Sequence, residues 1–264
     1  MNSSLARLRT PLESGFGQAG NIFALFVDVL RKTFRRPFEW REFIQQSWFI
    51  ASVSILPSAL VAIPFGAVVA LQTGSLIKQL GAESFTGATS VLATVQQAAP
   101  VVTALIIAGA AGSAVAADLG SRTIREEIDA LEVLGVDPVA KLVVPRVLGM
   151  TLVALLLNGL VSVVGIAGGY FFNVLLQGGT PGAYLASFSA LAQLPDLWIG
   201  EIKALVFGLI AGVIAAYKGL HPKGGPKGVG EAVNQSVVIT FLVLFFVNLI
   251  LTLVYLQVVP AKGA

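Results

Sequence analysis

The sequence predicts an all-α protein that crosses a membrane several times. Of its 264 residues, 56% are hydrophobic and only 12% are charged, and the mean hydropathy is +0.85. A soluble domain usually has about a quarter of its residues charged, so these few charges could not cover a water-facing surface. Long uncharged stretches and cations concentrated in alternate loops support the same conclusion.

The composition also excludes several kinds of chemistry. The chain has no cysteine and a single histidine, His221, so we expect no metal site and no cofactor. It lacks the G-x-x-x-x-G-K-[ST] phosphate loop, and the glycine-rich stretch 219–230 does not have that spacing. No H-E-x-x-H or G-x-S-x-G motif occurs, so we do not expect an enzyme. The net charge of +3 reflects cations held beside a membrane, and we expect no nucleic-acid partner.

Five membrane spans are predicted, within a membrane domain at residues 47–264. About 20 apolar residues suffice to cross the hydrocarbon. Four uncharged runs exceed that length, and a weaker run at 197–217 is added as a further span. The predicted spans are 47–74, 88–117, 147–176, 197–217 and 232–259. Pro57 and Pro64 leave open a broken or re-entrant first span. Small residues at four-residue spacing favour close helix packing, as at Gly165/Gly169, Gly208/Gly212 and Gly109/Ser113.

The fourth span is the weakest because Glu201 and Lys203 lie near its start. Two residues apart on a helix, their side chains point in different directions and do not pair with each other. An ionisable residue within a membrane is a candidate functional residue. The alternative, that both side chains snorkel to the outer interface, stays open.

The distribution of cations predicts the orientation of the chain. Cytoplasmic loops are enriched in Lys and Arg. By alternation, three basic segments lie on one side: the stretch before the first span, the loop between spans two and three, and the loop between spans four and five. The opposite side has only Lys78, Lys203 and Lys262. We therefore expect a cytoplasmic amino terminus and an outer carboxyl terminus in the cytoplasmic membrane.

Residues 1–46 are predicted to form a cytoplasmic tail and an interfacial elbow helix. Phe23, Phe26, Val27, Leu30 and Phe34 fall on one helical face, and Asp28, Arg31, Lys32 and Arg35 lie away from it. Pro37 is expected to end this helix and turn the chain into the bilayer. A poorly ordered basic tail is the alternative. No signal peptide is expected.

A short charged helix is predicted at residues 121–134, between spans two and three. Thr123 and Glu126 have the spacing of a capping box, and Gly135 is a stop signal. Ile124, Ile128, Leu131 and Leu134 would form its apolar face. Its charged residues could be merely solvated, or they could contact a soluble partner; they are Arg122, Arg125, Glu126, Glu127, Asp129 and Glu132.

Three stretches together resemble the MlaE/YrbE family of ABC-transporter permeases, which serves the Mla and Mce lipid-transport systems. They are AGAAGSAVAADLGSRTIREEIDALEVLGVDPVAKLVVPR (108–146), EIKALVFGLIAG (201–212) and YKGLHPKGGPKGVGEAVNQSVV (217–238). The similarity covers the chain from about Phe34 onward. Two segments, RPFEWREF (36–43) and TIREEIDALEVLG (123–135), most resemble the actinobacterial Mce branch.

The resemblance implies a permease that pairs with a second, paralogous permease, binds a cytoplasmic ATPase dimer and docks to extracytoplasmic Mce-domain proteins. The segment 122–132 would be the coupling helix that contacts the ATPase. A lipid would occupy a cavity lined by spans one, two and five. The candidate residues of the lipid path are Gln97, Pro100, Glu201 and Lys203. Of these, Lys203 matches a basic position on the lipid route of the Mla branch.

Two departures from the Mla branch bear on the cargo. That branch has Glu where this chain has Gln97, and Arg where it has Ala110. A more neutral cavity suits less polar lipids, such as fatty acids, mycolic-type lipids or sterols. Two other functions stay open: an ATP-independent secondary transporter or channel, and a non-transporting membrane anchor for the Mce conduit.

Overall fold

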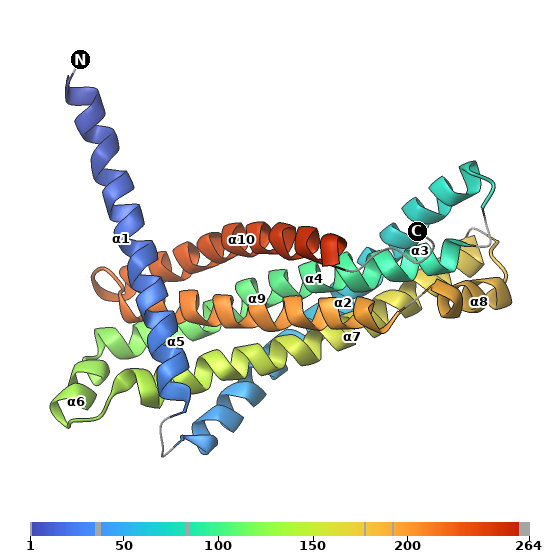
Figure 1. The fold of residues 1–264 in the computed structure, drawn as a ribbon. Helices are drawn as coiled ribbons and strands as arrows, with labels where there is room; N and C mark the ends of the chain where they lie inside the picture. The colour runs from blue at the N-terminus through green and yellow to red at the C-terminus, as the bar shows by residue number, and fades with distance from the viewer. Residues whose placement is uncertain (1, 35–37, 83–84, 177, 192, 259–264) are drawn as a thin grey trace.

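The computed structural model describes residues 2–34, 38–82, 85–176, 178–191 and 193–258, and every regular element within them is helical. Long helices form a bundle along one axis, and short helices lie at both of its ends (Figure 1). Five helical stretches are long and apolar enough to cross a membrane, as predicted: Trp40–Gln79, Thr86–Ile124, Val139–Leu176, Leu194–Leu220 and Gly225–Val258.

The first span is α2 (Trp40–Gln79), one uninterrupted α-helix that contains Pro57 and Pro64. The alternative of a broken first span is therefore wrong. Proline removes one backbone hydrogen bond and can bend a helix, but the neighbouring turns and the packing against the third span keep this helix continuous.

The second span is interrupted by two π-helical turns. It consists of α3 (Thr86–Ala93), η2 (Thr94–Ala98), α4 (Ala99–Ile106), η3 (Ile107–Ala111) and α5 (Gly112–Ile124). Each π turn contains one extra residue and is often found near functional sites. Pro100 is the second residue of α4, and it cannot donate a backbone hydrogen bond.

The remaining spans are continuous apart from one π turn. The third begins with η4 (Val139–Val143) and continues as α7 (Val144–Leu176); the fourth is α9 (Leu194–Leu220) and the fifth is α10 (Gly225–Val258). These helices extend beyond the uncharged runs in the sequence. Residues 259–264, at the end of the chain, lie outside the described part.

Two short helices lie at opposite ends of the bundle (Figure 1). α6 (Glu127–Val133) follows α5, and α8 (Pro181–Leu191), which the sequence reading did not predict, connects the third span to the fourth. α8 packs on α3, and the backbone N–H of Ala88 donates to Ser187 Oγ at 3.1 Å. The end opposite α6 is thus closed by a small helical cap.

The amino-terminal helix α1 (Asn2–Thr33) crosses the bundle near the α6 end instead of running along it (Figure 1). Val29 is fully buried, and Ile22, Leu25 and Phe26 pack on the same core. Phe23, Leu30 and Phe34, predicted on the apolar face, are exposed. Pro37 lies outside the described residues, but α1 ends at Thr33 and α2 begins at Trp40, as an elbow requires.

An ion pair holds α1 to the start of the third span. Lys32 Nζ lies 2.6 Å from Asp137 Oδ2, and the other oxygen of Asp137 accepts from the backbone N–H of Val139 at 3.0 Å. Partial burial alone would raise the pKa of Asp137. The hydrogen bond from Lys32 and the backbone N–H groups outweigh it, so the pKa lies below its ordinary value. The carboxylate therefore stays ionised at neutral pH.

Small residues bring the long helices into close contact. A Cβ atom on Gly66 of α2 would overlap the carbonyl oxygen of Gly165 in α7. On α9, a Cβ on Gly208 would lie 2.8 Å from the Cβ of Ala154, so α9 also approaches α7 closely. Gly109 has no such neighbour within 4 Å. The predicted four-residue spacing therefore packs α7 and α9, whereas Gly109 packs against nothing in the described chain.

We predict that Gly66→Ala lowers the free energy of unfolding by about 1–3 kcal/mol, the usual cost of overpacking. The added methyl group would force α2 and α7 apart because the overlapping atom belongs to the backbone. Thermal unfolding in mild detergent measures the change. Gly109→Ala adds the same methyl group into open space and is the matched control. Equal melting temperatures for the two variants would contradict the packing described above.

Candidate functional site

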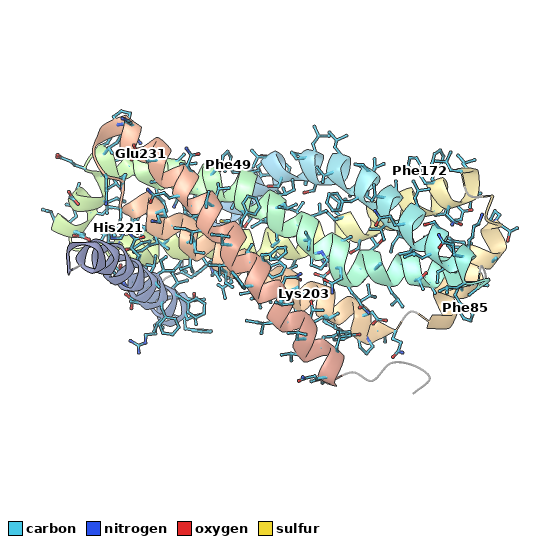
Figure 2. The ribbon with its side chains drawn as sticks, turned by 90° about the horizontal axis from the view of Figure 1, so that it is seen from above. Phe49, Phe85, Phe172, Lys203, His221 and Glu231 are labelled. Carbon is cyan, nitrogen blue, oxygen red and sulfur yellow. The ribbon has the colours of Figure 1, made fainter. Side chains whose placement is uncertain are left out.

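Two groups of polar residues are candidates for function. One lies around α6, at the end of the bundle that α1 crosses, and the other surrounds Lys203 within the spans. Figure 2 shows His221 and Glu231 at one end, Phe85 and Phe172 at the other, and Lys203 between them.

The segment predicted as one helix over residues 121–134 is divided in the structure. α5 continues to Ile124, and α6 begins at Glu127 after Glu126 adopts a left-handed conformation with φ of 60°. A non-glycine residue is uncommon in that region. Thr123 does not form the predicted capping box, because it lies in the last turn of α5 and does not cap α6. Its hydroxyl donates to the carbonyl oxygen of Leu119, in the same helix, at 3.0 Å.

The division changes which side chains α6 exposes. Ile128 is buried and Leu131 packs on the core, but Val133 and Leu134 are 88% and 76% exposed, and Ile124 is also exposed. The predicted apolar face therefore ends after Leu131. A hollow of about 350 Å³, lined by Leu131 and Leu134 among others, lies beside the helix. α6 thus offers apolar side chains to a partner outside the chain.

The charged residues of this segment fall into two groups. Glu127 pairs with Arg125 at 2.9 Å and with Arg122 at 3.6 Å, and these partly exposed pairs contribute little stability. Glu126, Asp129 and Glu132 are exposed, and no ion pair to them is found among the described residues. The exposed acids are free to meet a partner, whereas Glu127 is engaged within the chain.

Arg146 is the centre of a buried ionic cluster. It lies just before the predicted third span (147–176), which places it in the basic loop between spans two and three, but in the structure it is fully buried in the first turn of α7. Its Nη2 lies 2.7 Å from Asp118 Oδ2 in α5 and 3.1 Å from Glu42 Oε1 in α2. Its Nη1 donates to the carbonyl oxygen of Leu142 at 2.7 Å. One guanidinium therefore joins three membrane-spanning helices.

The cluster also reaches α6. The other oxygen of Asp118, Oδ1, accepts a hydrogen bond from Arg122 Nε at 3.2 Å, and Arg122 in turn faces Glu127 at the start of α6. Opposite charges thus alternate from Glu42 through Arg146, Asp118 and Arg122 to Glu127. This chain of contacts connects the exposed short helix with the first three spans.

Lys203 is the centre of the second group and is only 1% exposed. Its Nζ donates to the carbonyl oxygen of Gln96 at 2.8 Å and to Thr252 Oγ1 of α10 at 2.9 Å. Pro100 explains the first contact, because it has no N–H to donate to the carbonyl four residues before it. The ammonium group therefore satisfies a carbonyl that the proline leaves without its helical partner.

Gln97 lies at the edge of this group. Its Oε1 is 3.5 Å from Lys203 Nζ, a long distance for a hydrogen bond, and its Nε2 donates to Thr252 Oγ1 at 3.3 Å. The structure therefore brings together three of the predicted lipid-path residues, Gln97, Pro100 and Lys203, at η2.

Glu201 faces away from Lys203, as the helical spacing predicted. Asn158 Nδ2 of α7 donates to its Oε1 at 3.0 Å, so Glu201 lies between α9 and α7. Asn158 is itself buried, and its Oδ1 has no partner among the described residues. The two ionisable residues thus belong to different helix interfaces.

Asp196 extends the group around Lys203 and was not predicted from the sequence. Gln96 Nε2 donates to its Oδ1 at 2.7 Å, and the hydroxyl of Tyr255 in α10 donates to the same oxygen at 2.5 Å. Its other oxygen accepts from the backbone N–H of Gln193 at 2.8 Å, which caps α9. The three-residue spacing of Gln193 and Asp196 was the available signal, because it is that of a capping box.

We predict that Asp118→Asn destabilises the protein by about 3 kcal/mol, near the lower end of the cost of leaving a buried charge without its partner. Arg146 would keep only Glu42 as a carboxylate partner. Chemical unfolding in mild detergent measures the change. The exposed acid of α6 provides the control Glu132→Gln, which leaves stability unchanged. A double variant, Asp118→Leu with Arg146→Met, loses less than the single one; a larger loss would contradict this account.

Residues 43–254 match the family described as Permease MlaE. A probable ABC transporter permease protein of Rickettsia typhi is 34% identical over 198 residues, which cover 74% of this chain and 76% of the relative. A probable ABC transporter permease protein of Synechocystis is 34% identical, with 70% and 69% covered.

A third relative has a more specific name. The intermembrane phospholipid transport system permease protein MlaE of Haemophilus influenzae is 29% identical, and the similarity covers 63% of this chain and 64% of the relative. The family match includes α6, Arg146, and Lys203 with its acceptors Gln96 and Thr252. The chain therefore belongs to the MlaE family of ABC-transporter permeases.

Proposed function

We propose that this chain is the permease subunit of an Mce-type ABC transporter that moves lipids across the cytoplasmic membrane. Family membership supports the permease role, and the name of the Haemophilus relative supports a lipid as cargo. The resemblance of residues 36–43 and 123–135 to the actinobacterial branch supports the Mce assignment. The neutral Gln97 favours a weakly polar cargo, such as a fatty acid, a mycolic-type lipid or a sterol.

The proposed assembly contains a paralogous second permease, a cytoplasmic ATPase dimer and extracytoplasmic Mce-domain proteins. We orient the chain with α1, α6 and the α9–α10 connection toward the cytoplasm. This orientation is supported by the position of these segments at one end of the bundle (Figure 1) and by their excess of Lys and Arg. The amino terminus is then cytoplasmic, and α10 runs toward the outer side.

The observation that carries the proposal is the form of α6. It is short, it exposes Val133, Leu134, Asp129 and Glu132, and it is joined through Arg122 and Asp118 to Arg146 within the bundle. A partner that displaces α6 therefore acts on three spans at once. An ATPase that changes shape on nucleotide binding would use this contact to drive the permease.

We predict that Asp129→Lys combined with Glu132→Lys weakens co-purification of the ATPase by about tenfold or more, because like charges at an interface cost several kcal/mol. Both residues are exposed, so the variant should remain folded in the membrane. Pull-down of the ATPase from mild detergent gives the measurement. Glu231→Lys, an exposed charge reversal on α10 at the same end, is the matched control (Figure 2).

The result distinguishes the proposal from its alternatives. Unchanged ATPase binding in the double variant would rule out α6 as the contact. Lipid transport by the reconstituted chain with no ATPase present would show a secondary transporter instead.

The group around Lys203 is the proposed lipid-path element. It is a cation enclosed among apolar spans and held by Gln96 and Thr252, at the interface of the second, fourth and fifth spans. Ionisable groups within a membrane usually mark a route for substrate or ions. Glu201 faces α7 and is assigned to a separate part of the path.

We predict that Lys203→Met lowers lipid transport by about tenfold or more in the reconstituted complex, whereas Gln97→Leu has a smaller effect because its contact with Nζ is long. The ATPase still co-purifies, since α6 is not altered. Transport of a fluorescent fatty acid into vesicles provides the measurement, with Lys227→Met, an exposed lysine near the start of α10, as the control. Unchanged uptake in both variants, with intact Mce-protein attachment, would favour the non-transporting anchor.

A further inference from the structure

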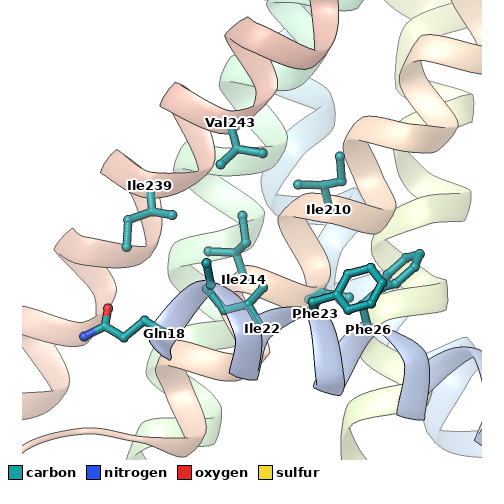
Figure 3. Close-up of a pocket in the computed structure, with 10 residues that line it drawn as sticks. Gln18, Ile22, Phe23, Phe26, Ile210, Ile214, Ile239 and Val243 are labelled. Atoms are coloured by element: carbon teal, nitrogen blue, oxygen red, sulfur yellow. The ribbon is translucent and has the colours of Figure 1, made fainter. Parts of the chain in front are cut away.

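A groove of about 550 Å³ lies between α1, α9 and α10 (Figure 3). Its volume falls within the range of roughly 300–1,000 Å³ found for small-molecule sites. Ile22, Phe23 and Phe26 of α1 form one side. The other two sides are formed by isoleucine and valine side chains of α9 and α10, among them Ile214 and Val243. Nearly all of the lining is apolar.

A buried cation lies next to the polar end of this groove. Gln18 lines the groove, and its Oε1 accepts a hydrogen bond from Lys218 Nζ at 3.2 Å. Lys218 is only 6% exposed, and its Nζ also donates to Gln235 Oε1 of α10 at 3.0 Å. Both acceptors are neutral amides, so they orient the ammonium group without balancing its charge.

No ion pair to the lysines at this end is found among the side chains that the structure describes. Lys223, in the connection between α9 and α10, lies close enough to repel Lys218. No carboxylate is found within 4.0 Å of either lysine among the described residues. A ligand with one negative charge and an apolar body would therefore match the site, its charge at the lysines and its body in the groove.

We propose that this groove holds an anionic glycerophospholipid of the adjacent leaflet, with an acyl chain between α1, α9 and α10 and the phosphate at Lys218 and Lys223. Basic pockets between spans at the cytoplasmic side are known to bind anionic headgroups. Ordinary surrounding lipid requires neither a preformed groove nor a buried cation. The charge complementarity selects this occupant over an uncharged apolar segment of another protein.

The site is separate from the group around Lys203. Between Lys203 and the groove, α9 carries the fully buried Phe207, which packs with Ala104, Ala108 and Leu244. The bound lipid is therefore a resident of the fold and not the transported cargo. It fastens residues 18–26 of α1 to α9 and α10, while Lys32 and Asp137 hold the end of the same helix. This inference does not rest on the proposed transport function.

The test uses the full chain in nanodiscs that contain phosphatidylcholine and phosphatidylglycerol in equal amounts. After transfer to mild detergent, native mass spectrometry counts the lipids that each chain retains. We expect one phosphatidylglycerol per chain and little phosphatidylcholine. Val243→Trp fills the groove and lowers retention by about tenfold or more. Lys218→Met removes one headgroup contact and lowers retention about fivefold.

Two controls alter similar residues outside the groove. Leu249→Trp adds an indole to the exposed face of α10, and Lys141→Met removes an exposed lysine near α6; both retain phosphatidylglycerol as the unaltered chain does. Equal retention of both phospholipids, or equal loss in Leu249→Trp and Val243→Trp, would overturn the proposal.

Because the chain has no cysteine, Ile239→Cys gives a further check. A disulfide-linked dimer formed through it would show that a second copy covers the groove, and would also overturn the proposal.

Discussion

The buried guanidinium of Arg146 is the constraint on which the α6 end of the bundle depends. A charge removed from water is tolerated only when opposite charges and hydrogen bonds surround it. Asp118 and Glu42 provide them from two other spans, and the carbonyl oxygen of Leu142 accepts a further bond. The positions of α2, α5 and α7 at this end are therefore coupled. Because Asp118 also binds Arg122, the orientation of α6 is coupled to the same group.

Much of the fold could be predicted from the sequence because the membrane imposes strong rules. Uncharged runs longer than the bilayer identified four of the five spans, and a weaker apolar run indicated the other. Glycines at four-residue spacing marked the faces of α7 and α9 that pack closely. The break at Glu126 could not be predicted, because local propensity favours one helix there and only the tertiary contacts of Thr123 and Ile128 divide it. α8 was missed since it has neither the length of a span nor a charge pattern.

The candidate site was only partly predictable for a different reason. Lys203 could be identified because a cation within an apolar helix is rare. Its main acceptor is a backbone carbonyl, and the sequence does not reveal which carbonyl of a neighbouring helix lies opposite a given side chain. Arg146 was misassigned for a similar reason: its burial depends on Asp118, a residue 28 positions away whose side chain meets it only in the folded bundle.

The two π turns on either side of α4 have a mechanical consequence. A π turn contains one residue more than an α-helical turn, so tightening it to α-helix would rotate the adjoining helix by about 100° about its axis. With one such turn at Thr94–Ala98 and the other at Ile107–Ala111, tightening the first would rotate α4 relative to α3, and tightening the second would rotate α5 relative to α4. The second span therefore contains two positions at which a change of helix type would turn one part of it against the other, and Pro100 lies in the first turn of α4, between them.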